Sequence, residues 1–215
     1  MIEKMFNGPY LRQLDNIVQW SEMDVFQRES VSQHSFKVTV FTRVLLEDIL
    51  GHVDPGSADN WTVTLFKRDC VDYAMFHDFD EALIRRDISH VTKYNRFNGP
   101  EIRRNLNALS EHLAQQEFRD GTKSGDFVFE NVIHPAPAVK RFVKLCDWLA
   151  MAFFIRREQR MGNSNMRLED TTVFNGVRTA VEDVRKLFSQ EEWETVQPRL
   201  EVLDIIMNMI YEKRS

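Results

Sequence analysis

The sequence from Tyr73 to Glu81 reads YAMFHDFDE, an apolar helical run followed at once by one histidine and three acidic residues. An ionised carboxylate among apolar side chains costs roughly several kcal/mol unless a positive charge or a metal ion pairs with it. The apolar part therefore predicts a core helix, and the polar part predicts a functional site where that helix ends. Other segments of the chain indicate which residues would complete such a site.

Apolar residues recur at three- and four-residue steps along most of the chain, which is the spacing of one face of an α-helix. Turn chemistry separates these segments, for example Gly51 followed by DPGS at 54–57, and the sequence NGP at 98–100. No strand alternation and no internal repeat stand out, so the predicted fold class is all-α, a globular helical bundle. We expect helices at about 11–18, 32–50, 61–79, 100–118, 139–159, 171–188 and 191–211.

The same spacing predicts which side chains face the core. Apolar residues follow at three- and four-residue steps in the second helix: Phe36, Val40, Val44 and the pair Leu45/Leu46. In the third helix, the residues expected to point inward are Leu65, Val71, Ala74 and Met75. The last helix carries a further apolar face, which packs either on the core or on another subunit: Leu203, Ile206, Met207 and Ile210.

Composition narrows the class of protein. A chain of 215 residues with 43% hydrophobic residues has enough apolar side chains for one sizeable core. The net charge of −5 argues against a general nucleic-acid binder, which normally carries a basic face. No segment approaches the about 20 apolar residues of a membrane span, and the N-terminus has no secretory signature. Two widely separated cysteines, Cys70 and Cys146, fit a reducing environment, so we expect a soluble cytoplasmic protein.

Polar residues occupy apolar positions at three places in the expected core helices. His34 begins the second helix, His77 and Asp78 end the third, and Asp147 interrupts the most hydrophobic helix. Each has an ordinary explanation: His34 as a helix cap, or Asp147 as the surface partner of Lys144. Together they form a nitrogen and oxygen donor set that suits Mn, Fe, Co or Zn better than Ca. Four protein ligands would leave positions for water and substrate, as in a catalytic site.

The flanking sequences give this order of residues a resemblance. His34, then His77-Asp78, then Asp147 is similar to the metal-binding signature of the HD-domain phosphohydrolases. Over about residues 8–165 the chain resembles the bacterial 5′-deoxynucleotidases, a group that also includes phage deoxyadenosine triphosphate triphosphohydrolases. The matching sequence segments are RESVSQHS at 28–35, HDFDE at 77–81, VTKYN at 91–95 and VKLCD at 143–147.

The resemblance implies a helical HD-domain fold and activity on deoxynucleoside 5′-phosphates, with dATP among the candidate substrates. It implies one divalent ion (Co, Mn, Zn, Mg or Fe) held by the four residues named above. Glu81 would assist the attacking water, and its spacing from His77 would place both on one helix face if the helix continues. The resemblance assigns the substrate to four further residues: Lys144 and Lys93 at phosphate, Trp20 near the base or sugar, and Asp87 in the sugar site.

Two positions depart from the pattern of these relatives. Gln19 stands where arginine is common before the tryptophan, which removes an expected phosphate contact. The segment after Glu81 is one residue longer than in the relatives, and this spacing counts against the assignment of Asp87. Two alternatives stay open: a phosphodiesterase or (p)ppGpp-type hydrolase of the wider HD group, and a non-catalytic helical module that senses nucleotides.

The remaining expectations concern organisation. We expect an HD-domain core at 1–165 and C-terminal helices at 166–215 that pack on the core or on another subunit. The resemblance implies a homo-oligomer that acts on deoxynucleotides, without a nucleic-acid polymer or a membrane as partner. It would work in the cytoplasm of a cell or of a phage-infected host.

Overall fold

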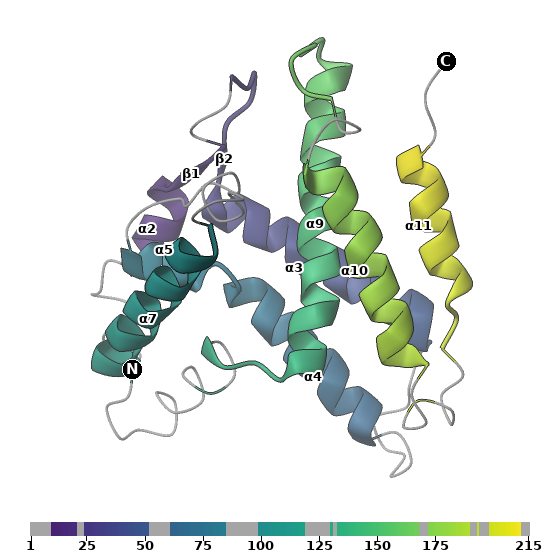
Figure 1. Ribbon diagram of the computed structural model, residues 1–215, viewed down its shortest axis with the longest axis horizontal. Helices are drawn as coiled ribbons and strands as arrows, with labels where there is room; N and C mark the ends of the chain where they lie inside the picture. The colour runs from purple at the N-terminus through teal and green to yellow at the C-terminus, as the bar shows by residue number, and fades with distance from the viewer. Residues whose placement is uncertain are drawn as a thin grey trace. The chain divides into compact units, whose positions relative to one another are not determined.

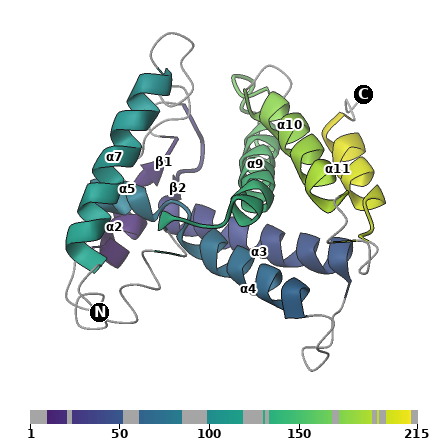
Figure 2. The ribbon, with the colours of Figure 1, turned by 60° about the horizontal axis from the view of Figure 1, so that its bottom comes forward.

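The computed structural model describes residues 10–20, 24–51, 61–84, 99–118, 130, 133–167, 172–189, 193 and 198–211. Apart from one sheet of two very short strands, the elements in these ranges are α-helices, which confirms the predicted all-α class (Figures 1 and 2). None of the described helices is long and apolar enough to cross a membrane. The chain divides into two compact units, each assembled from two separate segments.

Unit 1 consists of Met1–Phe36 and Phe76–Pro135. Its elements are α2 (Tyr10–Asn16), β1 (Val18–Gln19), β2 (Glu29–Ser30), the first residues of α3 (Val31–Leu50), α5 (Phe79–Ile84) and α7 (Gly99–Phe118). Helix α5 packs against both α2 and α7. Their small core joins the two segments of the unit and contains Leu14, Ile17, Val31, Phe79, Ala82 and Ala114.

Unit 2 consists of Lys37–Met75 and Ala136–Ser215. Its elements are the remainder of α3, helix α4 (Trp61–Phe76), α9 (Pro137–Arg160), α10 (Thr172–Phe188) and α11 (Glu201–Tyr211). Helix α10 packs along α9 and also contacts α11 (Figure 1). An aromatic cluster fills part of this core, with edge-to-face contacts among Phe66, Phe142, Phe188 and Trp193.

The beginning of the chain differs from the sequence prediction. Helix α2 ends at Asn16, and Val18–Gln19 pairs antiparallel with Glu29–Ser30, where we had expected helix and loop. Strands of two residues are too short to show alternation, so the sequence carried no signal for them. The Val31 N–H donates to the Ile17 carbonyl and extends this pairing to the start of α3.

Two predicted faces are only partly correct. On α3, Leu45 and Leu46 are buried as expected, but Phe36, Val40 and Val44 are exposed and Val38 is buried instead. This helix has apolar side chains on more than one side, so periodicity alone did not identify the face that packs. On α4, Ala74 is buried as expected and Met75 is exposed. On α11, the structure buries Leu203, Ile206 and Ile210.

Helix ends follow local chemistry. Gly51 has a φ of 69° and ends α3, and its N–H donates to the Glu47 carbonyl, as expected for a glycine C-cap. Helix α4 ends at Phe76 rather than continuing to Phe79, so His77 and Asp78 form a turn before α5. Helix α11 begins at Glu201, just after Pro198, whereas the sequence had predicted a start near 191.

Candidate metal centre and active site

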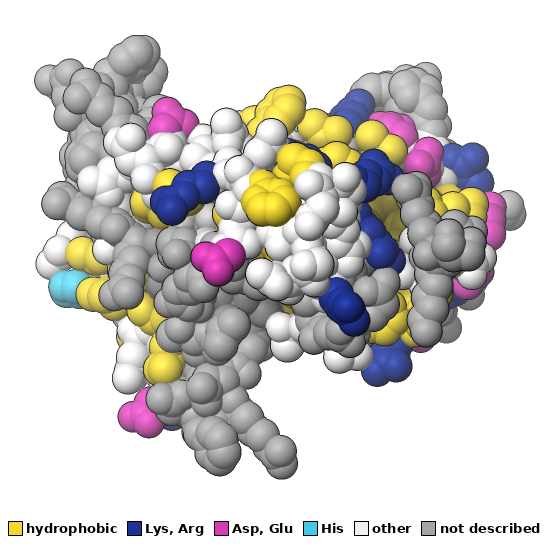
Figure 3. Space-filling model, turned by 90° about the horizontal axis from the view of Figure 1, so that it is seen from above, with side chains coloured by type: hydrophobic (Ala, Val, Ile, Leu, Met, Phe, Trp, Pro, Cys, Tyr) yellow, Lys and Arg dark blue, Asp and Glu magenta, His cyan; other side chains and the backbone are white. Residues whose placement is uncertain are grey.

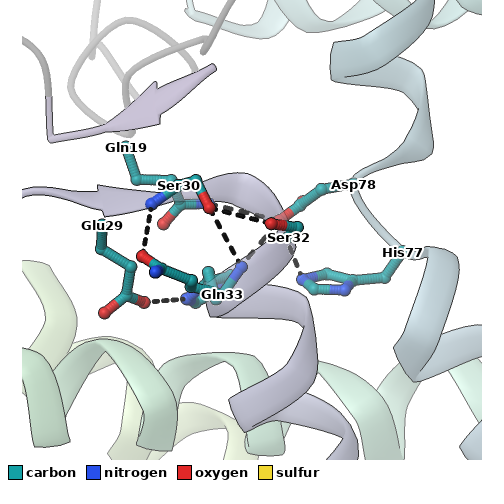
Figure 4. Close-up of polar contacts among 8 residues, drawn as sticks. Gln19, Glu29, Ser30, Ser32, Gln33, His77 and Asp78 are labelled. Carbon is teal, nitrogen blue, oxygen red and sulfur yellow. Dashed lines mark hydrogen bonds and ion pairs between the residues drawn. The ribbon is translucent and has the colours of Figure 1, made fainter. Parts of the chain in front are cut away.

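The start of α3 is fixed by a reciprocal pair of hydrogen bonds. The Ser30 N–H donates to Gln33 Oε1 at 3.1 Å, and the Gln33 N–H donates to Ser30 Oγ at 3.3 Å (Figure 4). This arrangement is a capping box, in which the residue before the helix and the third residue within it satisfy each other's backbone donors. His34 follows immediately, so the cap defines the orientation of the helical turn that carries it.

The turn between α4 and α5 positions the second part of the site. His77 and Asp78 occupy this turn, and the Glu81 N–H donates to the Asp78 carbonyl at 3.0 Å. The prediction that Glu81 shares a helix face with His77 is wrong, because the helix breaks between them. The turn nevertheless keeps the three residues in one short segment of unit 1.

His34, His77 and Asp78 come together in unit 1. Asp78 Oδ2 lies 3.1 Å from His77 Nε2 and 3.9 Å from His34 Nε2. The two imidazole rings are 5.5 Å apart at their centroids. One donor atom from each residue lies within 4.8 Å of the others, and His34 is only 2% exposed. Two imidazole nitrogens and a carboxylate oxygen fit a borderline divalent metal such as Mn, Fe, Co or Zn.

Two polar side chains from the short sheet contact two of these three residues, His34 and Asp78. The Glu29 carboxylate lies 3.6 Å from His34 Nδ1, the ring nitrogen that does not face Asp78. The Gln19 side-chain amide donates to Asp78 Oδ2 at 3.4 Å (Figure 4). Gln19 and Glu29 are register partners across β1 and β2, so this sheet supplies one contact to each of two candidate ligands.

Glu81 lies on α5 next to the same turn. Its side chain is 2% exposed, although glutamate is seldom buried in proteins unless it is paired. A buried carboxylate beside a cluster of histidines matches the acid or base role that the sequence predicted for it. The role itself stays a prediction.

Asp147 and Lys144 lie on α9 in unit 2. Asp147 is buried, and Lys144 Nζ contacts its Oδ2 at 2.6 Å. The same ammonium lies 4.7 Å from the ring centre of Trp148, so two contacts hold it. The sequence left two options for Asp147, a metal ligand or the ion-pair partner of Lys144. The structure contains the ion pair between Lys144 and Asp147. The assignment of Asp147 as the fourth metal ligand stays a prediction.

Of the other three predicted substrate residues, the structure describes only Trp20. Trp20 follows β1, is half-buried and has a φ of 61°, a left-handed conformation that is uncommon for a bulky residue. Such strained residues are concentrated at functional sites. Lys93 and Asp87 lie outside the described residues.

Sequence reasoning missed Glu29 and assigned Gln19 only as a lost phosphate contact. The sequence SVSQ at 30–33 is a capping-box sequence and could have predicted that the helix carrying His34 starts here, but it gave no signal for Glu29. The contact from Gln19 to Asp78 depends on the pairing of two-residue strands 10 residues apart in the sequence. No local pattern encodes it.

The helical fold of this chain is similar to that of a solved protein with an HD domain. A solved HD-domain phosphohydrolase from Listeria innocua superimposes with a TM-score of 0.58 at 16% identity, covering 97% of this chain and 98% of that chain. Residues 7–195 match the family described as 5′-deoxynucleotidase YfbR-like, and the chain belongs to that family. As a member of a 5′-deoxynucleotidase family, it is a hydrolase. No protein with a curated description gives a significant sequence match.

Proposed function

We propose that this protein hydrolyses 5′-phosphate groups of deoxynucleotides with the help of one divalent metal ion. The observation that supports this most directly is the grouping of His34, His77 and Asp78 in a chain of the YfbR-like 5′-deoxynucleotidase family. The family supports the substrate class, and the donor atoms support the metal. A nucleotide sensor would have no use for the buried Glu81 beside that grouping.

His34, His77 and Asp78 would hold the metal, with Asp147 as the proposed fourth ligand. The bound ion would supply a water of lowered pKa and would polarise a phosphoryl oxygen. Mn, Fe, Co, Zn and Mg are the candidate ions, and the mixed nitrogen and oxygen donors favour the transition metals.

The protein's own residues would manage the proton and the phosphate charge. Glu81 is proposed to accept a proton from the attacking water or to donate one to the leaving oxygen. Lys144 is proposed to balance negative charge on the phosphoryl oxygens, with Lys93 as a second cation and Asp87 at the sugar. Because Lys144 also contacts Asp147, its phosphate role requires the ammonium to serve both groups.

A small nucleotide is a better proposed substrate than a nucleic-acid polymer. Figure 3 shows one face of the molecule, on which the described Lys and Arg side chains are interspersed with acidic and hydrophobic ones. Polymer binders normally present a continuous basic surface, and the net charge here is −5. Deoxyadenylates such as dATP remain the proposed preferred substrates within this class, in a cytoplasmic setting.

The proposed function is tested by measuring release of phosphate and of triphosphate from all deoxynucleoside mono- and triphosphates, with Mn, Co, Mg and Zn each supplied separately. We expect metal-dependent release from at least one deoxynucleotide, and no release after chelation. Cleavage of bis-phosphodiesters or of (p)ppGpp with inert deoxynucleotides would contradict the proposal. Binding of nucleotides without turnover under any metal would indicate a sensor.

Base preference is assigned to Trp20. Trp20→Ala should narrow the differences in kcat/KM among the four deoxynucleotides, because removal of the bulky indole would relieve a steric restriction on which base fits beside it. Rates with each base should be compared between the wild type and the variant. An unchanged ranking of the four bases would remove Trp20 from base selection.

Self-association is also proposed, on the basis of an exposed apolar stripe. Phe36, Val40 and Val44 on α3 are 70%, 46% and 51% exposed and lie at four-residue intervals on one helix face. A two-fold dimer buries the same surface on both copies, so one stripe would suffice for a symmetric contact. Light scattering of Val40→Glu should give a smaller mass than the wild type if the stripe forms the interface.

A further inference from the structure

We propose that Glu29 is a positioning residue that fixes the tautomer and the ring orientation of His34. The inference rests on the proposed metal site and adds a residue to it. The carboxylate of Glu29 lies 3.6 Å from His34 Nδ1. Both residues are only 2% exposed, so water competes little for this contact.

The two nitrogens of His34 face different partners. Nδ1 faces Glu29, while Nε2 lies 3.9 Å from Asp78 Oδ2, on the side of the other candidate ligands. A neutral imidazole carries its proton on one nitrogen and offers a lone pair on the other. At 3.6 Å the Glu29 carboxylate is beyond hydrogen-bond distance of Nδ1, but its negative charge favours the tautomer with the proton on Nδ1. This tautomer leaves the lone pair of Nε2 directed at the metal site. Carboxylates commonly support metal-bound histidines in this way.

The backbone makes Glu29 a rigid support. Glu29 pairs with Gln19 across the short sheet, and the next residue, Ser30, caps α3. The residue after that, Val31, is fully buried and bonded through its N–H to the Ile17 carbonyl. Glu29 and His34 are therefore held by the same strand-to-helix junction, and this fixes the separation of their side chains.

The test compares the wild type with Glu29→Ala and Glu29→Gln. The metal-free proteins are titrated with Co²⁺ and Mn²⁺ to obtain the Kd, and long-range ¹H–¹⁵N spectra report the tautomer of His34. We expect Glu29→Ala to raise the Kd by about 10- to 100-fold and to convert His34 toward the Nε2–H tautomer. Glu29→Gln, which keeps an acceptor oxygen without the charge, should fall between Glu29→Ala and the wild type in both measurements.

The matched control is Glu158→Gln. Glu158 is also fully buried, and it accepts a hydrogen bond from the Asn163 amide at 3.0 Å, but it belongs to unit 2. This variant should lose thermal stability while leaving the His34 tautomer and the metal Kd unchanged. If it changes both as much as Glu29→Ala does, the effect is one of general destabilisation and the inference is wrong.

The outcomes separate this inference from the proposed function. If the wild type binds the metal and hydrolyses deoxynucleotides while Glu29→Ala retains the Kd and the tautomer, only the role of Glu29 is refuted. If the wild type binds none of Mn²⁺, Co²⁺, Mg²⁺ and Zn²⁺ and releases no phosphate or triphosphate with any of them, both proposals fail. Should Glu29→Ala not fold, Glu29→Gln decides, and a wild-type Kd together with a wild-type tautomer in that variant refutes the role.

Discussion

Glu81 is the residue whose substitution separates catalysis from metal binding. It is buried on α5 and follows Asp78 by three residues, but the proposed ligand set does not include it. We expect Glu81→Gln to lower kcat by about 10²- to 10⁴-fold, the usual contribution of a general acid or base, while the metal Kd stays the same. Phosphate release and metal titration on one preparation measure both quantities.

The glutamine variant keeps the size of the side chain, so a loss of folding is not the expected cause of lower activity. Far-UV circular dichroism of Glu81→Gln should match that of the wild type. Wild-type turnover in this variant would exclude Glu81 from proton transfer. A loss of metal binding would instead place Glu81 among the ligands.

The two buried cysteines make stability depend on pH in the alkaline range. Burial raises the pKa of Cys146 to about 12 and the pKa of Cys70 well above its ordinary value of 9.0. Below pH 9 both thiols are protonated in the folded and unfolded chains, and their contribution to stability is fully present. Between pH 9 and 12 the unfolded chain releases these protons while the folded chain retains them, so the free energy of unfolding should fall.

Urea unfolding at pH 8, 9 and 10 measures this effect when the wild type is compared with Cys70→Ala. Lysines and tyrosines titrate in both proteins, so the difference between the two curves isolates the thiol. The wild type should lose stability faster by up to about 1.4 kcal/mol per pH unit, the limit for one proton. Parallel curves would show that Cys70 ionises in the folded protein as it does in the unfolded chain.

At the scale of elements, Gly176 determines how closely α10 approaches α9. A Cβ at this position would overlap the indole of Trp148, which is only 7% exposed and has little room to move. Glycine to alanine in a helix ordinarily stabilises a protein by about 0.5–1 kcal/mol. Here we expect Gly176→Ala to destabilise by about 1–3 kcal/mol, the usual cost of overpacking, measured by chemical denaturation.

Thr179→Ala on the exposed side of α10 is the matched control, since it changes helix propensity without changing the contact with α9. It should be neutral or slightly stabilising. If Gly176→Ala is also stabilising, α9 and α10 can move apart easily, and their close contact at Gly176 does not contribute to the free energy of unfolding.

Helix existence could be predicted from the sequence, but strand pairing and several helix ends could not. The turns at Gly51 and near residue 98 carry strong local signals, and the long periodic segments between such turns became helices. The end of helix α4 after Phe76 could not be predicted, because no glycine or proline follows Phe76 directly in the sequence. The β1–β2 pairing depends on contacts between segments, and the sequence encodes those only through the whole fold.

Some residues of the candidate site could also be predicted from the sequence, and others could not. The residue types of His34, His77 and Asp78 were readable because ionisable groups in apolar helices are costly, and the structure brings these three together. Glu29 and Gln19 were not readable as supports, because acidic and amide side chains are ordinary in a polar segment. Only the register of the short sheet gives these two residues a role.

For the whole molecule, the order of the segments indicates what metal binding would stabilise. Unit 1 is built from Met1–Phe36 and Phe76–Pro135, and His34 lies in the first segment while His77 and Asp78 lie in the second. An ion bound by all three would therefore cross-link two segments that a small apolar core otherwise joins. A ligand that binds only the folded state stabilises it by about 2.7 kcal/mol at a concentration 100 times its Kd.

Removal of the metal should therefore lower the Tm, by about 5–10 °C for a chain of this size, as measured by scanning calorimetry before and after dialysis against a chelator. His77→Asn should abolish the increase in Tm that the bound metal produces. Asp147→Asn should also reduce the metal-induced gain in Tm if Asp147 is the fourth ligand. Asp183→Asn, which removes a half-exposed carboxylate on α10, is the control and should show the same metal-induced increase in Tm as the wild type.

If Asp147→Asn also shows the wild-type increase in Tm, the metal site consists of the three residues of unit 1, and Asp147 is not a ligand.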